Sequence, residues 1–352
     1  MQPLVSIVIL NYNGKELSKC LIESIKRIDF PKEKLEIIVV DNASRDGSQE
    51  FIRKNYPEIK LIENKKNLGF DEGTNVGVRY CNGKYIAILS NDILVDENWL
   101  KELVRAIESD EKIGIVEPWV YNKTPEGKYI IDDYGTTSIF HTHIFRKDVK
   151  IDTSEYVRVF TATSACLFRR DIVELPFDKD YFAYAEDTYF GWLVRLKGYE
   201  IIHVPSSKIY HEGSETIKKL NKNNYFDFLA ERNKIMNLLI FYEGKTLLKL
   251  LPLLLLFTIL INLFNIRLLL TRFKVYFWLI KNIRLVRKKR ADIQKQRKVP
   301  DKDILKLMSC KFIEERRINN RIAKFFVQVL NGFSCVYCRI INLGVVGDKK
   351  KT

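Results

Sequence analysis

Short, uninterrupted apolar runs in the first ninety residues constrain the fold of this chain more than any other feature. Each run is rich in Val, Ile or Leu, ends in polar residues and is separated from the next by a longer polar segment; the runs span residues 5–10, 35–40 and 85–89, and residues 59–63 are also expected to be extended. Strands buried on both faces are continuous apolar runs, whereas half-exposed strands alternate. We therefore predict an α/β fold with a mostly parallel central sheet and flanking helices.

Three of these runs end in polar segments that could form a ligand site. The segments are Asn11–Gly14, Asp41–Ser44 and Ser90–Asp92. Ligands of open α/β sheets bind beyond the carboxyl ends of parallel strands, so these segments are expected to form one site. Two local alternatives remain open, because Asp41–Ser44 is also good turn sequence and Ser90–Asp92 could simply cap the helix expected from Asp96 to Glu108.

Two further segments carry candidate chemistry. Residues 67–77 hold three glycines, which would allow either close backbone approach to a ligand or a tight loop. Glu186 and Asp187 are adjacent acids in an aromatic setting, where desolvation would raise a carboxyl pKa and make it a base. They could instead complement the dipole of a helix that they open. His211 is either a metal ligand or a structural residue.

Charge is divided unevenly along the chain. Residues 246–352 contain 24 Lys and Arg against 6 Asp and Glu, whereas residues 1–245 contain 35 against 38. A near-neutral head with a basic tail indicates a catalytic or binding unit held at an anionic surface, either a membrane or a polynucleotide. We predict a catalytic domain at 1–245 and a basic helical tail at 246–352.

The tail also contains an apolar segment, residues 250–266, with no charge over 17 residues. That length is the lower limit for crossing a bilayer. Basic residues follow it, and if a single span left the head in the cytosol they would lie outside, against the positive-inside tendency. An interfacial or re-entrant segment is favoured over a span or a buried helix, which makes residues 246–300 a predicted membrane contact. The apolar stretch 325–341 has no assignment.

Six cysteines in 352 residues are too few and too scattered for a secreted disulfide scaffold. No signal peptide precedes the first apolar run, so a cytosolic head with reduced thiols is expected. Cys335 and Cys338 form one isolated CxxC without a second pair, which does not indicate zinc.

The order of these motifs resembles that of family 2 glycosyltransferases, in particular a rhamnosyltransferase-like branch. The resemblance covers about residues 3–245 and rests on residues 5–13, 39–44, 67–70, 90–92 and 185–187. It implies the GT-A fold, a nucleotide-sugar donor, a divalent cation (Mg²⁺ or Mn²⁺) and inversion at the anomeric carbon. Ser90 departs from the family pattern, because it replaces the first acid of the metal-binding DxD motif.

The resemblance also assigns roles by position. Asp187 would be the general base, with Glu186 beside it, and Asp92 and His211 would contact the metal or the diphosphate. The positions implied for the nucleotide-sugar are Asn11, Asn13, Asp41, Asn42, Asn67, Gly69, Asn75 and Asn91. The identity of the transferred sugar, a hexose or a deoxyhexose such as rhamnose, is left open.

The predicted function is transfer of a sugar from a nucleotide-diphosphate donor to a hydroxyl of a glycan or lipid-linked acceptor, in cell-surface polysaccharide or glycoconjugate synthesis. The expected location is the cytoplasmic side of the cell membrane. Two alternatives remain: a catalytically weak glycosyltransferase-like protein, suggested by Ser90, and a nucleic-acid-binding protein with a basic arm. The apolar segment 250–266 argues against nucleic acid, because such an arm has no need of it.

Overall fold

The computed structural model describes residues 3–124, 126–131, 135–145, 155–161, 165–213, 225–264, 266–315 and 318–345. It divides into two compact units. Unit 1 consists of residues 1–132, 150–190 and 199–221; unit 2 consists of residues 133–149, 191–198 and 222–352. The division therefore places the basic tail in one unit with three segments of the predicted head, residues 133–149, 191–198 and 222–245.

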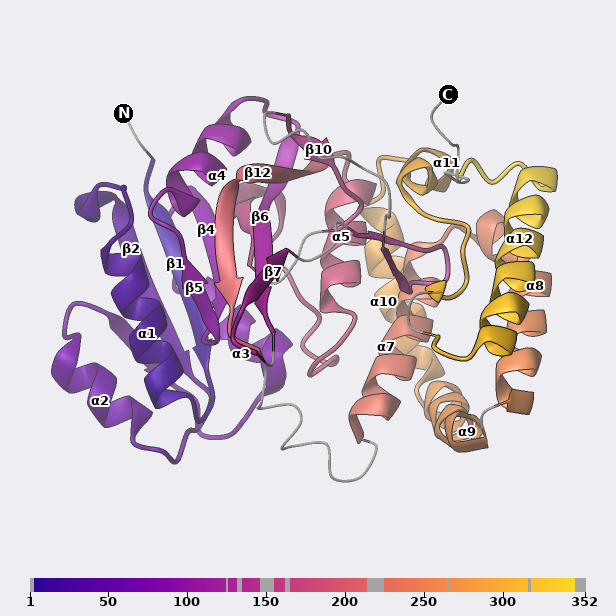
Figure 1. Cartoon of the computed structure of the whole chain (residues 1–352), viewed down its shortest axis with the longest axis horizontal. Helices are drawn as coiled ribbons and strands as arrows, with labels where there is room; N and C mark the ends of the chain where they lie inside the picture. Colours follow the sequence, from indigo (N-terminus) through magenta and orange to yellow (C-terminus); the bar gives the residue numbers. More distant parts are fainter. Residues whose placement is uncertain are drawn as a thin grey trace. The chain divides into compact units, whose positions relative to one another are not determined.

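Unit 1 is built on a ten-stranded sheet (Figure 1). The spatial order is β10-β12-β6-β11-β4-β1-β2-β3, with β5 paired to β12 and β7 paired to β6. The strands are β1 (Val5–Asn11), β2 (Leu35–Asp41), β3 (Lys60–Glu63), β4 (Tyr85–Ser90), β5 (Ile93–Val95), β6 (Ile113–Lys123), β7 (Tyr129–Ile131), β10 (Val157–Arg158), β11 (Leu167–Arg169) and β12 (Glu200–His211).

The sheet is mixed rather than mostly parallel. Strands β3, β2, β1 and β4 pair parallel with one another, as predicted from the apolar runs. Beyond them β11 is antiparallel to both β4 and β6, and β5, β7 and β10 also pair antiparallel. The prediction is therefore right for the N-terminal half of the sheet and wrong for the other half, where only β6 and β12 run parallel.

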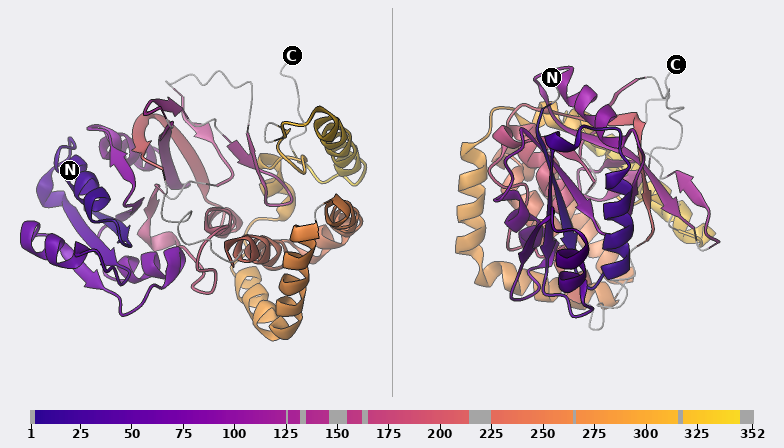
Figure 2. Two further views of the ribbon diagram at one scale, coloured as in Figure 1. Left: turned by 60° about the horizontal axis from the view of Figure 1, so that its bottom comes forward. Right: turned by 90° about the vertical axis from the view of Figure 1, so that its left-hand side faces the viewer.

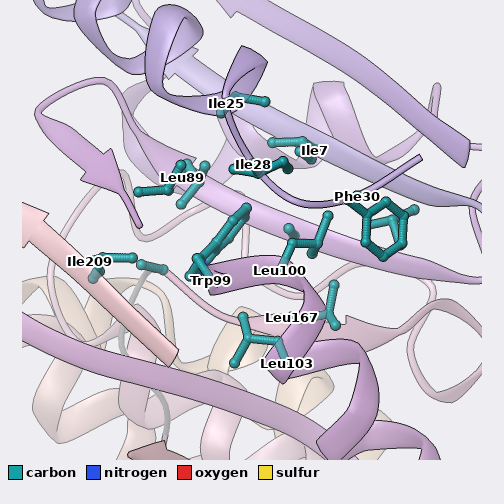
Figure 3. Close-up of a cluster of buried hydrophobic side chains, with 14 of the residues drawn as sticks. Ile7, Ile25, Ile28, Phe30, Leu89, Trp99, Leu100, Leu103, Leu167 and Ile209 are labelled. Atoms are coloured by element: carbon teal, nitrogen blue, oxygen red, sulfur yellow. The ribbon is translucent and has the colours of Figure 1, made fainter. Parts of the chain in front are cut away.

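Helices cover both faces of this sheet (Figures 1 and 2). They are α1 (Lys15–Lys26), α2 (Ser48–Asn55), α3 (Gly69–Val78) and α4 (Trp99–Glu108). On one face, α1, α2 and α4 enclose a core that includes Ile7, Leu89 and Trp99, all with 3% exposure or less (Figure 3). The fourth helix begins at Trp99 rather than Asp96, whose carboxylate instead accepts the Asn98 N–H at 3.1 Å.

The helix α3 lies directly against the other face because two glycines remove side chains at the contact. A Cβ added at Gly77 would lie 2.5 Å from Val8 Cγ1, and one at Gly73 would lie 2.7 Å from Leu10 Cδ1. Glycine costs helix stability, so its presence at both positions is explained by this close packing. Most of the glycine-rich segment is thus a helix rather than the loop that was one of its two interpretations.

Unit 2 is mainly helical, with a small hairpin of β8 (Gly135–Thr137) and β9 (His143–Phe145). Its helices are α7 (Tyr225–Phe241), α8 (Gly244–Phe264), α9 (Ile266–Lys281), α10 (Ile283–Lys295), α11 (Asp301–Ile304) and α12 (Arg321–Ile340). The helix α5 (Glu186–Leu196) begins in unit 1 and ends in unit 2. Among the described residues, no helix has both the length and the apolar character needed to cross a membrane.

Part of the basic tail is used inside unit 2 to cap a helix. Arg290 donates to the carbonyl oxygens of Leu239 and Tyr242, the latter at 2.7 Å, and Gln294 donates to Ile240 and Phe241 at 2.8 Å each. These acceptors lie at the C-terminus of α7, where carbonyl groups lack intrahelical partners and a cation is favourable. Such a cation stabilises the fold and is not free for an external anion.

A disulfide joins Cys310 to Cys335. Both cysteines lie in the 246–352 tail, outside the head for which reduced thiols were expected. Cys338, the other member of the CxxC, is a buried thiol whose pKa burial raises to about 11. Because Cys335 is bonded to Cys310, the CxxC does not act as a pair of metal ligands, in agreement with the sequence analysis.

Candidate active site

The three polar segments predicted to form a site do meet at one edge of the sheet. In the register of unit 1, Asn11 at the end of β1 pairs with Asp41 at the end of β2, and Leu10 pairs with Ser90 at the end of β4. The parallel pairing of these strands brings their carboxyl ends together, which is the physical basis of a ligand site at this edge.

Asn11 is the centre of a buried hydrogen-bond network at that edge. Its Nδ2 donates to Asp41 Oδ2 at 2.8 Å and to Ser44 Oγ at 3.2 Å. Its Oδ1 accepts from Ser18 Oγ and Asn91 Nδ2, both at 2.8 Å. Asn11 and Asp41 are fully buried. The predicted residues Asn11, Asp41 and Asn91 are thus brought together, and one asparagine connects all three strand ends.

The carboxylate of Asp41 is well satisfied. Its Oδ1 accepts the Ser44 N–H at 2.9 Å and the Gln49 amide at 2.6 Å, in addition to the bond from Asn11. The Ser44 contact is the Asx-type turn that the sequence allowed. Next to it, Ala43 has φ 66° and Asn13 has φ 51°, both in the left-handed region. Residues held in that region cost energy and concentrate at ligand sites.

A second network positions the segment before α3. Asn42 Nδ2 donates to Asn67 Oδ1 and to the Gly69 carbonyl, both at 2.9 Å, and Asn42 Oδ1 accepts from the Leu68 N–H at 3.1 Å. Gly69 has φ 80°, and a Cβ there would lie 2.2 Å from the carbonyl oxygen of Phe182. The predicted residues Asn42, Asn67 and Gly69 therefore form one connected group beside the strand ends.

A pocket of about 800 Å³ opens at the ends of β1 and β2. Asn13 and Asn67, both predicted, contribute to its wall. Three cationic residues that the sequence analysis missed, Arg45, Lys65 and Lys66, also line it. Their only sequence signal is position, because Arg45 follows the Asp41–Ser44 segment and the two lysines precede Asn67. A polar pocket with three cations suits an anionic ligand of nucleotide size.

Asp92 and His211 lie together on neighbouring segments, β12 being paired with β5. His211 Nε2 is 3.3 Å from Asp92 Oδ2, and His211 Nδ1 is 2.9 Å from Asn122 Oδ1. An amide oxygen only accepts, so Nδ1 carries a proton, and Nε2 is the ring nitrogen that faces Asp92. Asn122 was not predicted, because it lies 89 residues from His211.

The pair of Asp92 and His211 fits a divalent cation. Asp92 Oδ1 is buried and has no hydrogen-bond partner among the described residues, which is costly unless a ligand is bound. A carboxylate and an imidazole are suitable ligands for Mn²⁺, and Mg²⁺ prefers the oxygen. Within the described ranges no three His, Cys, Asp or Glu side chains cluster as a metal site. The remaining ligands would therefore have to come from a substrate and water.

Glu186 and Asp187 open α5, as predicted. The Asp187 Oδ1 accepts the Thr188 N–H at 2.6 Å. Glu186 keeps some exposed surface, but its Oε2 is buried without a hydrogen-bond partner in the described structure. Desolvation, together with the charge of Asp187, raises the pKa of Glu186 to about 7. The pair therefore holds a proton near neutral pH, as expected for neighbouring carboxyls in an enclosed site.

The loop before α5 is strained and tied to the strand-end edge. Phe182, Tyr184 and Ala185 have φ values of 70°, 71° and 65°. The Phe70 N–H donates to the Phe182 carbonyl at 2.6 Å, which joins this loop to the start of α3. Asn75, predicted to bind nucleotide, instead exchanges hydrogen bonds with the Phe177 backbone, at 2.9 Å and 3.3 Å.

Comparison with known proteins agrees with this geometry. The model of the family described as glycosyl transferase family 2 matches residues 6–175. A protein of Haemophilus influenzae named an uncharacterized glycosyltransferase is 31% identical over 66% of this chain and 76% of its own length. The chain belongs to glycosyl transferase family 2. The glycosyltransferase AglE of Haloferax volcanii is 32% identical over 49% of this chain, which spans about half of that relative (54%).

Two solved structures share the fold of this family 2 glycosyltransferase. Residues 1–349 of S. aureus TarS, in complex with UDP, match 96% of this chain and 91% of that one with a TM-score of 0.51 and 14% identity. GalNAc-T7, with UDP, GalNAc and Mn²⁺, matches 69% of this chain and 49% of that one with a TM-score of 0.56 and 17% identity. They support a GT-A-like α/β fold with a mixed sheet.

Proposed function

We propose that this glycosyltransferase moves a sugar, a hexose or a deoxyhexose such as rhamnose, from a nucleotide-diphosphate donor to a hydroxyl of a glycan or lipid-linked acceptor, with inversion. The observation that carries the proposal is the common edge of β1, β2 and β4. There a pocket lined by Arg45, Lys65 and Lys66 adjoins the buried network around Asn11 and Asp41. Cell-surface polysaccharide or glycoconjugate synthesis is the proposed biological role.

In this proposal the pocket binds the nucleotide. The lysines and Arg45 attract the diphosphate, while the network around Asp41 holds the walls of the pocket rigid. Asn13 and Ala43 keep their left-handed backbone because the Ser44 hydroxyl accepts the Asn13 N–H at 2.9 Å and the Arg45 N–H donates to Asn13 Oδ1 at 2.7 Å. The pocket is therefore preformed for its ligand.

A divalent cation, Mg²⁺ or Mn²⁺, is proposed at Asp92 and His211. When bound, it neutralises charge on the diphosphate leaving group. Asp92 supplies a carboxylate oxygen that has no other partner in the described structure, and Asn122 keeps His211 Nε2 turned toward it. GalNAc-T7, which shares the fold, was solved with UDP and Mn²⁺.

Asp187 is proposed to take the proton of the acceptor hydroxyl as that oxygen attacks the anomeric carbon. Glu186 holds the second carboxyl of the pair, and the charge of each raises the energy of ionising the other. Asp187 is the second residue of α5, which follows directly on the loop that Phe70 and Gly69 anchor to the strand-end edge. This connection fixes the position of the base relative to the donor pocket.

The test is transfer from UDP-, GDP- and dTDP-sugars with Mg²⁺ or Mn²⁺, on membranes that contain the chain and a lipid extract. Turnover of one donor that is abolished by chelator and by Asp187→Asn supports the proposal. Asp171→Asn, an exposed acid in the same unit, is the matched control and should keep full activity. Nucleotide binding without turnover in any assay would favour a catalytically inactive relative, and absence of nucleotide binding would refute the pocket assignment.

The location at the cytoplasmic side of the cell membrane, through residues 246–300, is also proposed. Its support is the excess of 24 cationic over 6 acidic residues in the 246–352 tail. Fractionation of cells that express the chain tests it, because a protein recovered only in the soluble fraction at every salt concentration would refute it.

A further inference from the structure

The large apolar side chains of helix α12 are exposed and point away from the rest of unit 2. Spaced by three or four residues along the helix, they form a continuous stripe, here called the α12 apolar face. Its members, with exposed fractions, are Ile322 (69%), Phe325 (62%), Phe326 (59%), Val329 (54%), Phe333 (48%), Val336 (53%) and Ile340 (77%). An exposed apolar stripe of this length marks an interaction surface.

The buried side of α12 consists of four small or medium-sized residues, two of them polar: Val327, Asn331, Ser334 and Cys338. Asn331 Oδ1 accepts the Phe312 N–H at 2.8 Å, and the Ser334 hydroxyl donates to the Cys310 carbonyl at 2.6 Å. The disulfide between Cys310 and Cys335 adds a covalent link. Specific bonds therefore attach this helix to unit 2 in one orientation, which leaves the α12 apolar face outward.

Two other helices of unit 2 expose apolar stripes as well. On α8 the exposed residues are Leu248, Leu251, Leu255 and Ile259, and on α9 they are Leu270, Phe273, Phe277 and Ile280. The helices α8 and α12 are joined, because the Tyr337 hydroxyl donates to the Lys249 carbonyl at 2.8 Å and the Lys249 ammonium donates to the Ile341 carbonyl at 3.0 Å. In both views α12 lies at the margin of unit 2 (Figures 1 and 2).

Charge identifies the partner of this face. The helix α12 contains no acidic residue, and it carries Arg321 and Lys324 in its first turn and Arg339 in its last. A second copy of the chain would bring together two tails that each have 24 cationic and 6 acidic residues, which is repulsive. An anionic lipid surface offers both the apolar interior and the negative headgroups that this combination fits.

We propose that the α12 apolar face inserts into the interface of an anionic membrane, with the helix lying in the membrane plane. The phenylalanines enter the acyl boundary while Arg321, Lys324 and Arg339 contact headgroup phosphates. This adds residues 321–340 to the membrane contact that is proposed above for residues 246–300. It rests on the membrane location proposed above and not on sugar transfer.

The test is co-sedimentation of the full chain with vesicles of phosphatidylcholine containing phosphatidylglycerol, and with vesicles of phosphatidylcholine alone. Phe325→Ser/Phe326→Ser should weaken binding to the anionic vesicles by roughly thirtyfold or more, from the apolar area withdrawn. Arg321→Gln/Lys324→Gln should weaken it by roughly tenfold and reduce its salt dependence. Tyr80→Ser/Tyr156→Ser, which removes two exposed aromatic rings from unit 1, is the matched control and should bind as the wild type does.

Thermal unfolding and nucleotide binding report whether each variant folds. Slower hydrogen exchange of α12 amides in wild-type protein on vesicles tests the same surface without any substitution. If the Phe325→Ser/Phe326→Ser variant binds the vesicles as strongly as the wild type does, the assignment to α12 is overturned and the membrane location is retained. If the wild-type protein binds nucleotide but not vesicles, both the α12 assignment and the membrane location are overturned, and the proposed catalytic site is unaffected. If the wild-type protein is a dimer that does not bind vesicles, and only the Phe325→Ser/Phe326→Ser variant is monomeric, the α12 apolar face binds a second copy and the proposal is overturned.

Discussion

Asn11→Ala is the sharpest test of the hydrogen-bond network at the candidate site, because one side chain makes four contacts there. The substitution removes a donor from the fully buried carboxylate of Asp41 and the acceptor of the fully buried Ser18 hydroxyl. A buried group left unsatisfied costs about 1–3 kcal/mol, and more when it is charged. Ser44 and Asn91 are only half-buried, so water can replace their lost bonds. We expect a loss of about 3 kcal/mol in the free energy of unfolding.

The assay is denaturant unfolding monitored together with nucleotide affinity. Ser18→Ala alone should cost about 1 kcal/mol, and the double variant should show a coupling of about 1 kcal/mol, because Ser18 has already lost its acceptor when Asn11 is replaced. Asn98→Ala, an exposed asparagine that makes no cap hydrogen bond to its helix, should stay within about 0.5 kcal/mol of wild type. Fully additive effects, or an Asn11→Ala protein that is as stable as wild type, would refute this account of the network.

Three other outcomes are expected. Glu186→Gln should move the acidic limb of the pH–rate profile from about pH 7 to lower pH, because the variant lacks the carboxyl group whose pKa is raised. It should also abolish the fall in stability that accompanies ionisation of Glu186 as the pH rises toward 7. An unchanged acidic limb and an unchanged slope of stability against pH would contradict both expectations. Asn122→Leu should weaken Mn²⁺ binding about 10–100-fold by calorimetry, since it frees the ring of His211, and equal affinity would argue against that role. Reductant should lower the unfolding free energy of unit 2 by about 3 kcal/mol through opening of the Cys310–Cys335 loop, with no further effect on a double Ser variant.

The accuracy of the sequence analysis follows from how far apart the interacting residues lie. Strands β1, β2 and β4 were predicted within a residue or two, because each carries its own apolar pattern. The antiparallel strands β5 and β11 have three residues each, too few for any periodicity. Together with β7 and β10 they make the sheet mixed, and the pairing of β5 and β11 depends on partners distant in sequence.

The same limit applies to the site. Asn11, Asp41 and Asp92 could be located because strand ends in a parallel sheet share an edge whatever the rest of the chain does. The orientation of His211 depends on Asn122, and the anchoring of Asn75 depends on Phe177, 102 residues away. Neither contact has a local signal. A motif can name the residue, but only the fold shows whether its side chain faces the pocket or is held by backbone groups elsewhere.

The basic tail shows why composition alone assigns roles poorly. An apolar stripe with helical spacing has the same sequence pattern whether it faces a protein core or the outside. Residues 325–341 therefore had no assignment until the structure showed that the large apolar side chains of α12 are exposed. A count of charged residues does not distinguish cations used inside the fold from exposed ones. Arg290 and Arg297 donate to carbonyl groups at the end of α7, whereas Arg284 and Arg287 are exposed. The cations available to an anionic surface are therefore fewer than the net charge indicates. Substituting Arg290 should destabilise unit 2, whereas substituting Arg287 should change only the salt dependence of membrane binding.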